Sequence, residues 1–181
     1  RSIYNLLFLW YNYFKMLILG IDPGIASTGY GLVEEKDRRL VSLDYGCIST
    51  KPGTGKEDRL EKLYRELKDL ISRYKPDAMA IEKLFFGTNT KTAIAVGESK
   101  GIALLSAAEM SLKVVEYMPL EIKLAITGYG KAEKHQIQQM VKSLLNLDKV
   151  PKPDDAADAL AVAICHIHSQ KMTQIVKEMA Q

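Results

Sequence analysis

Two hydrophobic periods alternate along the chain from residue 16 onward. Period two, which is typical of strands, occurs at residues 17–22, 28–35, 39–49, 78–82 and 113–118. Period 3.6, which is typical of helices with one buried face, occurs at residues 57–74, 90–110, 132–146 and from about 154, with a helical turn over 119–126. The first three strands are joined by short turns and the later ones by helices. We therefore predict an α/β domain with a mixed central sheet, in which three antiparallel N-terminal strands precede parallel strands and helices flank both faces.

Two of the predicted strands end in an acid. Strand 17–22 ends at Asp22 and strand 78–82 ends at Glu82. The strand period places Gly20 on the same face as Asp22, and Ala80 on the same face as Glu82. Because each acid follows a very small residue on its own face, a helix has room to approach the sheet closely there.

The last helix carries the acids that would complete such a site. Asp155 and Asp158 are three residues apart in an alanine-rich segment, so they project from one side of a helix that can pack closely. Four carboxylates gathered in one cleft would repel each other, and burying them would be costly. Divalent cations resolve that conflict, and hard oxygen ligands suit Mg²⁺ or Mn²⁺. The order of these acids predicts a two-metal phosphodiesterase site.

Each acid also has a purely structural alternative. Asp22 precedes Pro23 and Gly24, which is typical of a turn, and Glu82 can be a solvated strand end. Asp155 can be a first-turn acid that the helix dipole favours, and we expect Asp154 to be the cap of that helix. Only the joint pattern favours a metal site.

Three segments carry a resemblance to a known family. Met16–Gly31, Ala80–Phe86 and Asp154–Ala163 resemble the signature blocks of RuvC-type Holliday junction resolvases, and the likeness extends over Met16–His168. The resemblance implies an RNase H-like fold, a homodimer, and metal-dependent endonuclease cleavage of four-way DNA junctions in homologous recombination and DNA repair. It implies paired symmetric nicks with 5′-phosphate and 3′-hydroxyl ends, and a branch-migration helicase complex as a partner.

The same resemblance assigns roles to particular residues. Asp22, Glu82, Asp155 and Asp158 match the catalytic carboxylates, which would hold two Mg²⁺ ions, with Mn²⁺ as a substitute. Phe85 matches an aromatic residue that engages junction bases. Two basic residues, Lys123 and Lys134, match lysines placed near the scissile phosphates.

Composition and charge fit one DNA-binding domain. The chain has 181 residues, of which 47% are hydrophobic, and its net charge is +3. Residues 122–152 hold six lysines and two acids, so the rest of the chain is near −1. The basic region is either an ordinary solvated lysine face or a phosphate-binding surface, and the suspected metal site favours the second.

The ends of the chain differ from its centre. Residues 1–15 hold six of the fourteen aromatic residues, and we expect them to be a non-native or disordered extension before an RNase H-like nuclease domain at 16–170. Residues 171–181 are expected to form a frayed C-terminal tail. The extension is too short and too polar for a membrane span and lacks the pattern of a signal peptide. Two cysteines, Cys47 and Cys165, are too few for a disulfide framework, so we expect a reduced, cytoplasmic protein.

The predicted helix at 90–110 contains Gly97 and Gly101 one turn apart, which implies close packing despite the cost of glycine in a helix. The simpler expectation is that they pack on the protein's own sheet, and the alternative is a two-fold partner helix.

Other functions remain open at this stage. A related nuclease acting on RNA–DNA hybrids or flaps would use the same acids, and a non-catalytic junction-binding protein would keep the fold. An actin-like ATPase would need a duplicated domain, for which the 166 residues after Lys15 leave no room.

Overall fold

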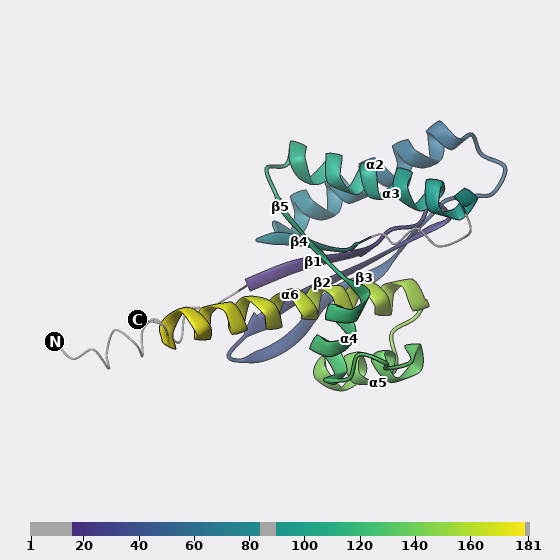
Figure 1. The fold of residues 1–181 in the computed structure, drawn as a ribbon. Coiled ribbons are helices and arrows are strands. Elements are labelled where there is room, and N and C mark those ends of the chain that lie inside the picture. Colours follow the sequence, from purple (N-terminus) through teal and green to yellow (C-terminus); the bar gives the residue numbers. More distant parts are fainter. Residues whose placement is uncertain (1–15, 84–89, 180–181) are drawn as a thin grey trace.

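A five-stranded mixed sheet runs through the centre of the molecule (Figure 1). The structure is a computed structural model that describes residues 16–83 and 90–179. The strand order is β3-β2-β1-β4-β5, with β1, β2 and β3 antiparallel and β4 and β5 parallel to β1. The strands are β1 (Met16–Asp22), β2 (Ser27–Lys36), β3 (Arg39–Ser49), β4 (Ala78–Glu82) and β5 (Lys113–Tyr117). The predicted mixed sheet is confirmed.

Helices cover both faces of this sheet (Figure 1). One face carries α2 (Lys56–Tyr74) and α3 (Thr90–Glu109), and the other carries α4 (Pro119–Thr127), α5 (Lys134–Leu144) and α6 (Asp154–Met179). The alternation along β1 explains the two layers, because Leu19 joins the core that includes α2, while Ile18 joins the core that includes α6. Both side chains are fully buried.

Glycines let α6 lie directly on the sheet. A Cβ at Gly20 would be 2.0 Å from the carbonyl oxygen of Ala159, and one at Gly29 would be 2.0 Å from the carbonyl oxygen of Asp155. Neither position admits a side chain unless the helix moves away. The predicted close approach of the alanine-rich helix is confirmed, and it sets the height of that helix's acids above β1 and β2.

Two elements differ from the sequence prediction. The helical turn expected after β5 is a nine-residue helix, α4, which begins with Pro119 at its first turn and ends at a left-handed Gly128. The expected frayed tail is wrong as far as residue 179, because α6 continues to Met179. An ion pair between Lys171 of α6 and the buried Glu35 of β2 holds the start of that segment on the sheet. The extension 1–15 lies outside the described residues. None of the helices in the described part is long and apolar enough to cross a membrane.

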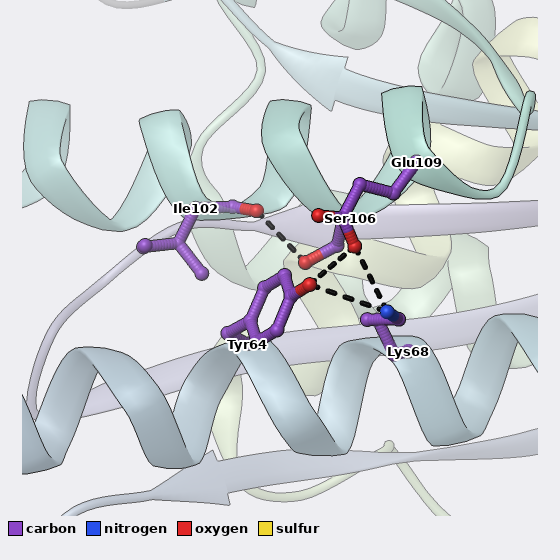
Figure 2. A network of polar contacts seen from close by, with 5 residues as sticks. All are labelled: Tyr64, Lys68, Ile102, Ser106 and Glu109. Carbon is purple, nitrogen blue, oxygen red and sulfur yellow. Dashed lines mark hydrogen bonds and ion pairs between the residues drawn. The ribbon is translucent and has the colours of Figure 1, made fainter.

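A polar network joins α2 to the C-terminal half of α3 (Figure 2). The hydroxyl of Tyr64 donates to the carboxylate of Glu109, and Lys68 Nζ lies 2.8 Å from the same carboxylate oxygen and 3.2 Å from the Tyr64 oxygen. On α3 itself, Ser106 Oγ donates to the carbonyl of Ile102 over 2.9 Å. These contacts fix α3 against α2.

The expectation that Gly97 and Gly101 pack on the protein's own sheet is wrong. A Cβ added at either position meets no described atom within 4 Å. The inner side of α3 is formed instead by Ala103 and Ala107, which are fully buried. The two glycines therefore belong to an open face of α3.

Candidate active site

The two strand-end acids lie next to each other at one edge of the sheet. Strands β1 and β4 are parallel and paired in register up to Ile21 and Ile81, so the following residues, Asp22 and Glu82, leave neighbouring strands at the same end. Both side chains are only partly exposed. The sequence predicted this juxtaposition.

The first two turns of α6 bring Asp155 and Asp158 to the same edge. Asp155 lies above Gly29, which is paired with Asp22 across β1 and β2. Asp154 is the first residue of the helix, and its carboxylate accepts a 2.6 Å hydrogen bond from Lys152 Nζ. Asp154 thus lies inside the first turn and not at the cap position where we expected it, and its ion pair with Lys152 lowers the pKa of its carboxylate.

Electrostatics show that the four acids act on one another. Burial, followed by the charges of Asp158, Asp155 and Glu82, raises the pKa of Asp22 to about 7. Burial followed by the charge of Asp158 raises the pKa of Glu82 as well. Carboxylates that shift one another in this way share one low-dielectric site, and they favour either protons or cations.

Two lysines face this group. Lys134, the first residue of α5, donates a 2.8 Å hydrogen bond from Nζ to Oδ2 of Asp158, which raises the lysine's pKa. The charge of Lys123 on α4 offsets part of the rise in the pKa of Glu82. A hollow of about 200 Å³ between these elements is lined by Glu82, Pro119, Ile122, Lys123, Lys134, Ile137, Asp158, Ala161 and Val162. The structure thus brings both predicted lysines and two of the predicted acids to one cavity.

Lys100 is a residue of this site that the sequence analysis missed. It lies on α3 and is 7% exposed, and its Nζ is 2.8 Å from Oε2 of Glu116 and 3.4 Å from the backbone carbonyl oxygen of Glu82. Its charge also lowers the pKa of Glu82. The small residues beside it, Ser99 and Gly101, give only a weak local signal of such a buried role, because its partner Glu116 lies on another element.

Most of the chain matches one known protein family. The family model described as "Crossover junction endodeoxyribonuclease RuvC" matches residues 18–166. The chain belongs to the RuvC family. It is 55% identical over 162 residues to the crossover junction endodeoxyribonuclease RuvC of Alkaliphilus oremlandii, which covers 90% of this chain and 99% of that protein.

Solved structures of the RuvC family show the same fold. RuvC of Thermus thermophilus superposes with a TM-score of 0.82 at 32% identity, covering 87% of this chain and 97% of that one. The same protein in complex with a Holliday junction substrate gives a TM-score of 0.80 at 30% identity, with 87% and 96% covered. The RNase H-like fold expected from the sequence is confirmed.

The donor set of this RuvC-family site fits a divalent cation in its chemistry. Asp22, Glu82, Asp155 and Asp158 supply only carboxylate oxygens, the ligands that Mg²⁺ prefers, and the raised pKa of Asp22 shows that positive charge is under-supplied there. Within residues 16–83 and 90–179, no three acid, histidine or cysteine side chains already converge on one point as metal ligands.

The predicted aromatic residue of this RuvC-family chain, Phe85, lies outside the described residues. Its neighbour Glu82 ends β4, and α3 begins at Thr90, so Phe85 belongs to the connection between the acid and the helix with the open glycine face.

Proposed function

We propose that this protein is a homodimeric resolvase that cuts four-way DNA junctions by metal-dependent hydrolysis, leaving 5′-phosphate and 3′-hydroxyl ends. One observation carries the proposal, namely the hollow that joins Glu82 and Asp158 to Lys123 and Lys134. Acids for metal ions and lysines for a phosphate then lie on the same cavity wall. Membership of the RuvC family supports the choice of a junction as substrate.

The carboxylates and the lysines have distinct roles in this mechanism. Bound between Asp22, Glu82, Asp155 and Asp158, two Mg²⁺ ions, or Mn²⁺ in their place, would supply an activated water and stabilise the leaving 3′ oxygen. Asp22, whose pKa is raised by burial and by the charges of the other three acids, would be one of the ligands that hold these ions. Lys123 and Lys134 neutralise charge that gathers on the phosphate, and Lys134 can do so once Asp158 turns from it toward a cation.

The open face of α3 supports the homodimer. Ile94 is 61% exposed and Leu105 is 49% exposed, and between them Gly97 and Gly101 leave space above the helix. Two such helices from two copies can approach closely, since glycine removes the side chains that would separate them. The network around Glu109 already holds the C-terminal half of α3 against α2 (Figure 2), so this face is presented rigidly.

A symmetric pair of sites also suits the substrate, because a four-way junction must be cut on two strands to be resolved. We propose that the dimer works in the cytoplasm, with a branch-migration helicase complex as the partner that supplies junctions. Added charge on the open face tests the dimer. A Cβ at Gly101 meets no described atom within 4 Å, so Gly101→Glu should leave the monomer folded and abolish dimerisation in analytical ultracentrifugation. Gln139→Glu on the exposed side of α5 is the control.

One experiment tests the function as a whole. The protein is incubated with a mobile four-way junction, a linear duplex and an RNA–DNA hybrid, each with Mg²⁺, Ca²⁺ or EDTA. We expect paired symmetric nicks in the junction with Mg²⁺ alone. Preferential cutting of the hybrid would identify a different RNase H-like nuclease, and junction binding without cleavage would identify a non-catalytic binding protein.

A further inference from the structure

A second hollow lies where β3 ends and α2 begins. Its volume is about 190 Å³, and it is lined by Thr50, Lys51, Thr54, Asp58, Arg59 and Lys62. Three of these residues are basic and one is acidic, so the lining carries a positive excess. A lining of this kind is suited to an anion rather than to an apolar ligand.

Two of the cations are held by groups at the end of β3, and Lys62 also pairs with Glu66 over 3.4 Å. Arg59 Nε donates to Thr50 Oγ1 over 2.7 Å, and Lys62 Nζ donates to the carbonyl oxygen of Ser49 over 2.7 Å. Thr50 is itself buried, and its hydroxyl donates to the carbonyl oxygen of Ile25. Within the described part of the chain, the terminal nitrogens of Arg59 have no other hydrogen-bond partner. The guanidinium is therefore held in place by one donor while its remaining donors are available to a ligand.

The position of this hollow relates it to the active site. The amide of Thr50 donates to the carbonyl oxygen of Ala26, which follows Asp22 by only four residues, so both features belong to one edge of the sheet. The start of α2 and the start of α6 lie at the same end of the molecule (Figure 1). The active-site acids are on the α6 face of that edge, and the second hollow is on the α2 face.

We propose that the hollow between Thr50 and Lys62 binds the phosphodiester backbone of a junction arm that leaves the active site across this edge. The inference rests on the proposed function, because it assigns a second contact to the same DNA. The planar guanidinium of Arg59 can donate hydrogen bonds to two phosphate oxygens at once, while Lys51 and Lys62 act as point charges. These contacts position the DNA and carry no sequence information.

The test compares neutral variants of the hollow with a control on the same helix. Arg59→Gln, Lys62→Gln and Lys51→Gln are made singly and together, and Arg65→Gln is the control, since Arg65 is exposed and pairs with Glu61. Junction affinity is measured over a range of salt concentrations with Ca²⁺ in place of Mg²⁺. Each lost phosphate contact should lower the slope of log affinity against log salt by about one unit. Single-turnover cleavage of fully bound junction should stay at the wild-type rate.

The outcomes separate this inference from the function on which it rests. A triple variant with the salt slope of the wild type and of Arg65→Gln would overturn it. Lys51→Gln guards against misfolding, because Lys51 is exposed and its side chain forms no hydrogen bond or ion pair with described residues. If Arg59→Gln has a lower melting temperature than the wild type, the salt slopes of the Lys51 and Lys62 variants are the test of the proposal. A wild-type protein that makes no paired nicks in a junction would instead refute the proposed function, whatever the slopes of the variants.

Discussion

The partly buried charge of Asp22 destabilises the folded protein, and one substitution can remove this effect. Its pKa is raised from 3.8 to about 7 by burial and by the neighbouring acids. Between these values the folded protein keeps a proton that the unfolded chain has lost. The free energy of unfolding therefore falls as pH rises through this window, and the full cost is present above about pH 7. Asparagine does not ionise, so Asp22→Asn removes the cost.

The size of the effect follows from the shift in pKa. A change from 3.8 to about 7 is about three units, which corresponds to about 4 kcal/mol above pH 7. The new amide has its own donors, and leaving them unpaired costs about 1–3 kcal/mol. We therefore expect Asp22→Asn to gain about 1–3 kcal/mol in metal-free buffer. For a domain of this size the melting temperature should rise by roughly 2–12 °C.

Thermal unfolding followed by circular dichroism measures this effect. The wild type and Asp22→Asn are melted in EDTA at about pH 5 and about pH 8, and the advantage of the variant should be larger at the higher pH. Excess Mg²⁺ should then stabilise the wild type more than the variant, because a ligand stabilises only the state that binds it. A variant that melts at or below the wild type at pH 8, or an advantage that does not grow with pH, would refute the proposed crowding of charge.

Three further sets of substitutions test the remaining assignments. Asp158→Asn should abolish cleavage and keep junction binding, whereas Asp154→Asn should cleave normally. Both are measured in gel assays, and the opposite result would reverse our assignment of the inner face of α6. Lys100→Met should lose about 1–3 kcal/mol of stability and need more Mg²⁺ for half-maximal cleavage, with rescue by Lys100→Arg; an unchanged Mg²⁺ titration would exclude a positioning role through Glu82. Phe85→Ala should lose roughly 1–3 kcal/mol of base stacking and cleave poorly while still dimerising, and a matching loss of stability would show that Phe85 is a core residue.

The position of the acids could be predicted because strand geometry is local. A period of two places Asp22 and Gly20 on one face, and parallel strands end at the same edge, so Asp22 and Glu82 had to meet if both strands formed. The need for a closely packed helix followed from the small residues, and Ala159 above Gly20 is that contact.

The residues that the sequence did not reveal depend on contacts between distant elements. Lys100 is buried because it pairs with Glu116 on β5, sixteen residues further along the chain. A local sequence pattern does not show which distant residue will be its partner. For the same reason, the sequence does not show whether Gly97 and Gly101 face the sheet or solvent. Helical periodicity places them on one side of α3, but only packing decides whether that side faces the sheet or solvent, and Ala103 and Ala107 occupy the inner side.

The lysines are distributed unevenly over the acids, and this predicts how metal binding depends on pH. Asp158 has Lys134 at 2.8 Å, and Glu82 has the charges of Lys123 and Lys100, whereas Asp22 has only the weaker influence of Lys134. Burial and the neighbouring acids raise the pKa of Asp22 to about 7, and Lys134 offsets this only in part, so below that pH a divalent cation must displace a proton from Asp22.

Metal binding should then release about one proton below pH 7, and the apparent Mg²⁺ affinity should fall about tenfold for each pH unit below that value. Calorimetric Mg²⁺ titrations in two buffers of different ionisation enthalpy measure the proton directly. Asp22→Asn, which has no proton to lose at this position, should show weaker but less pH-dependent binding. If the Mg²⁺ affinity of the wild type is constant between about pH 6 and about pH 8, a cationic group other than the nearby lysines already balances the charge of Asp22.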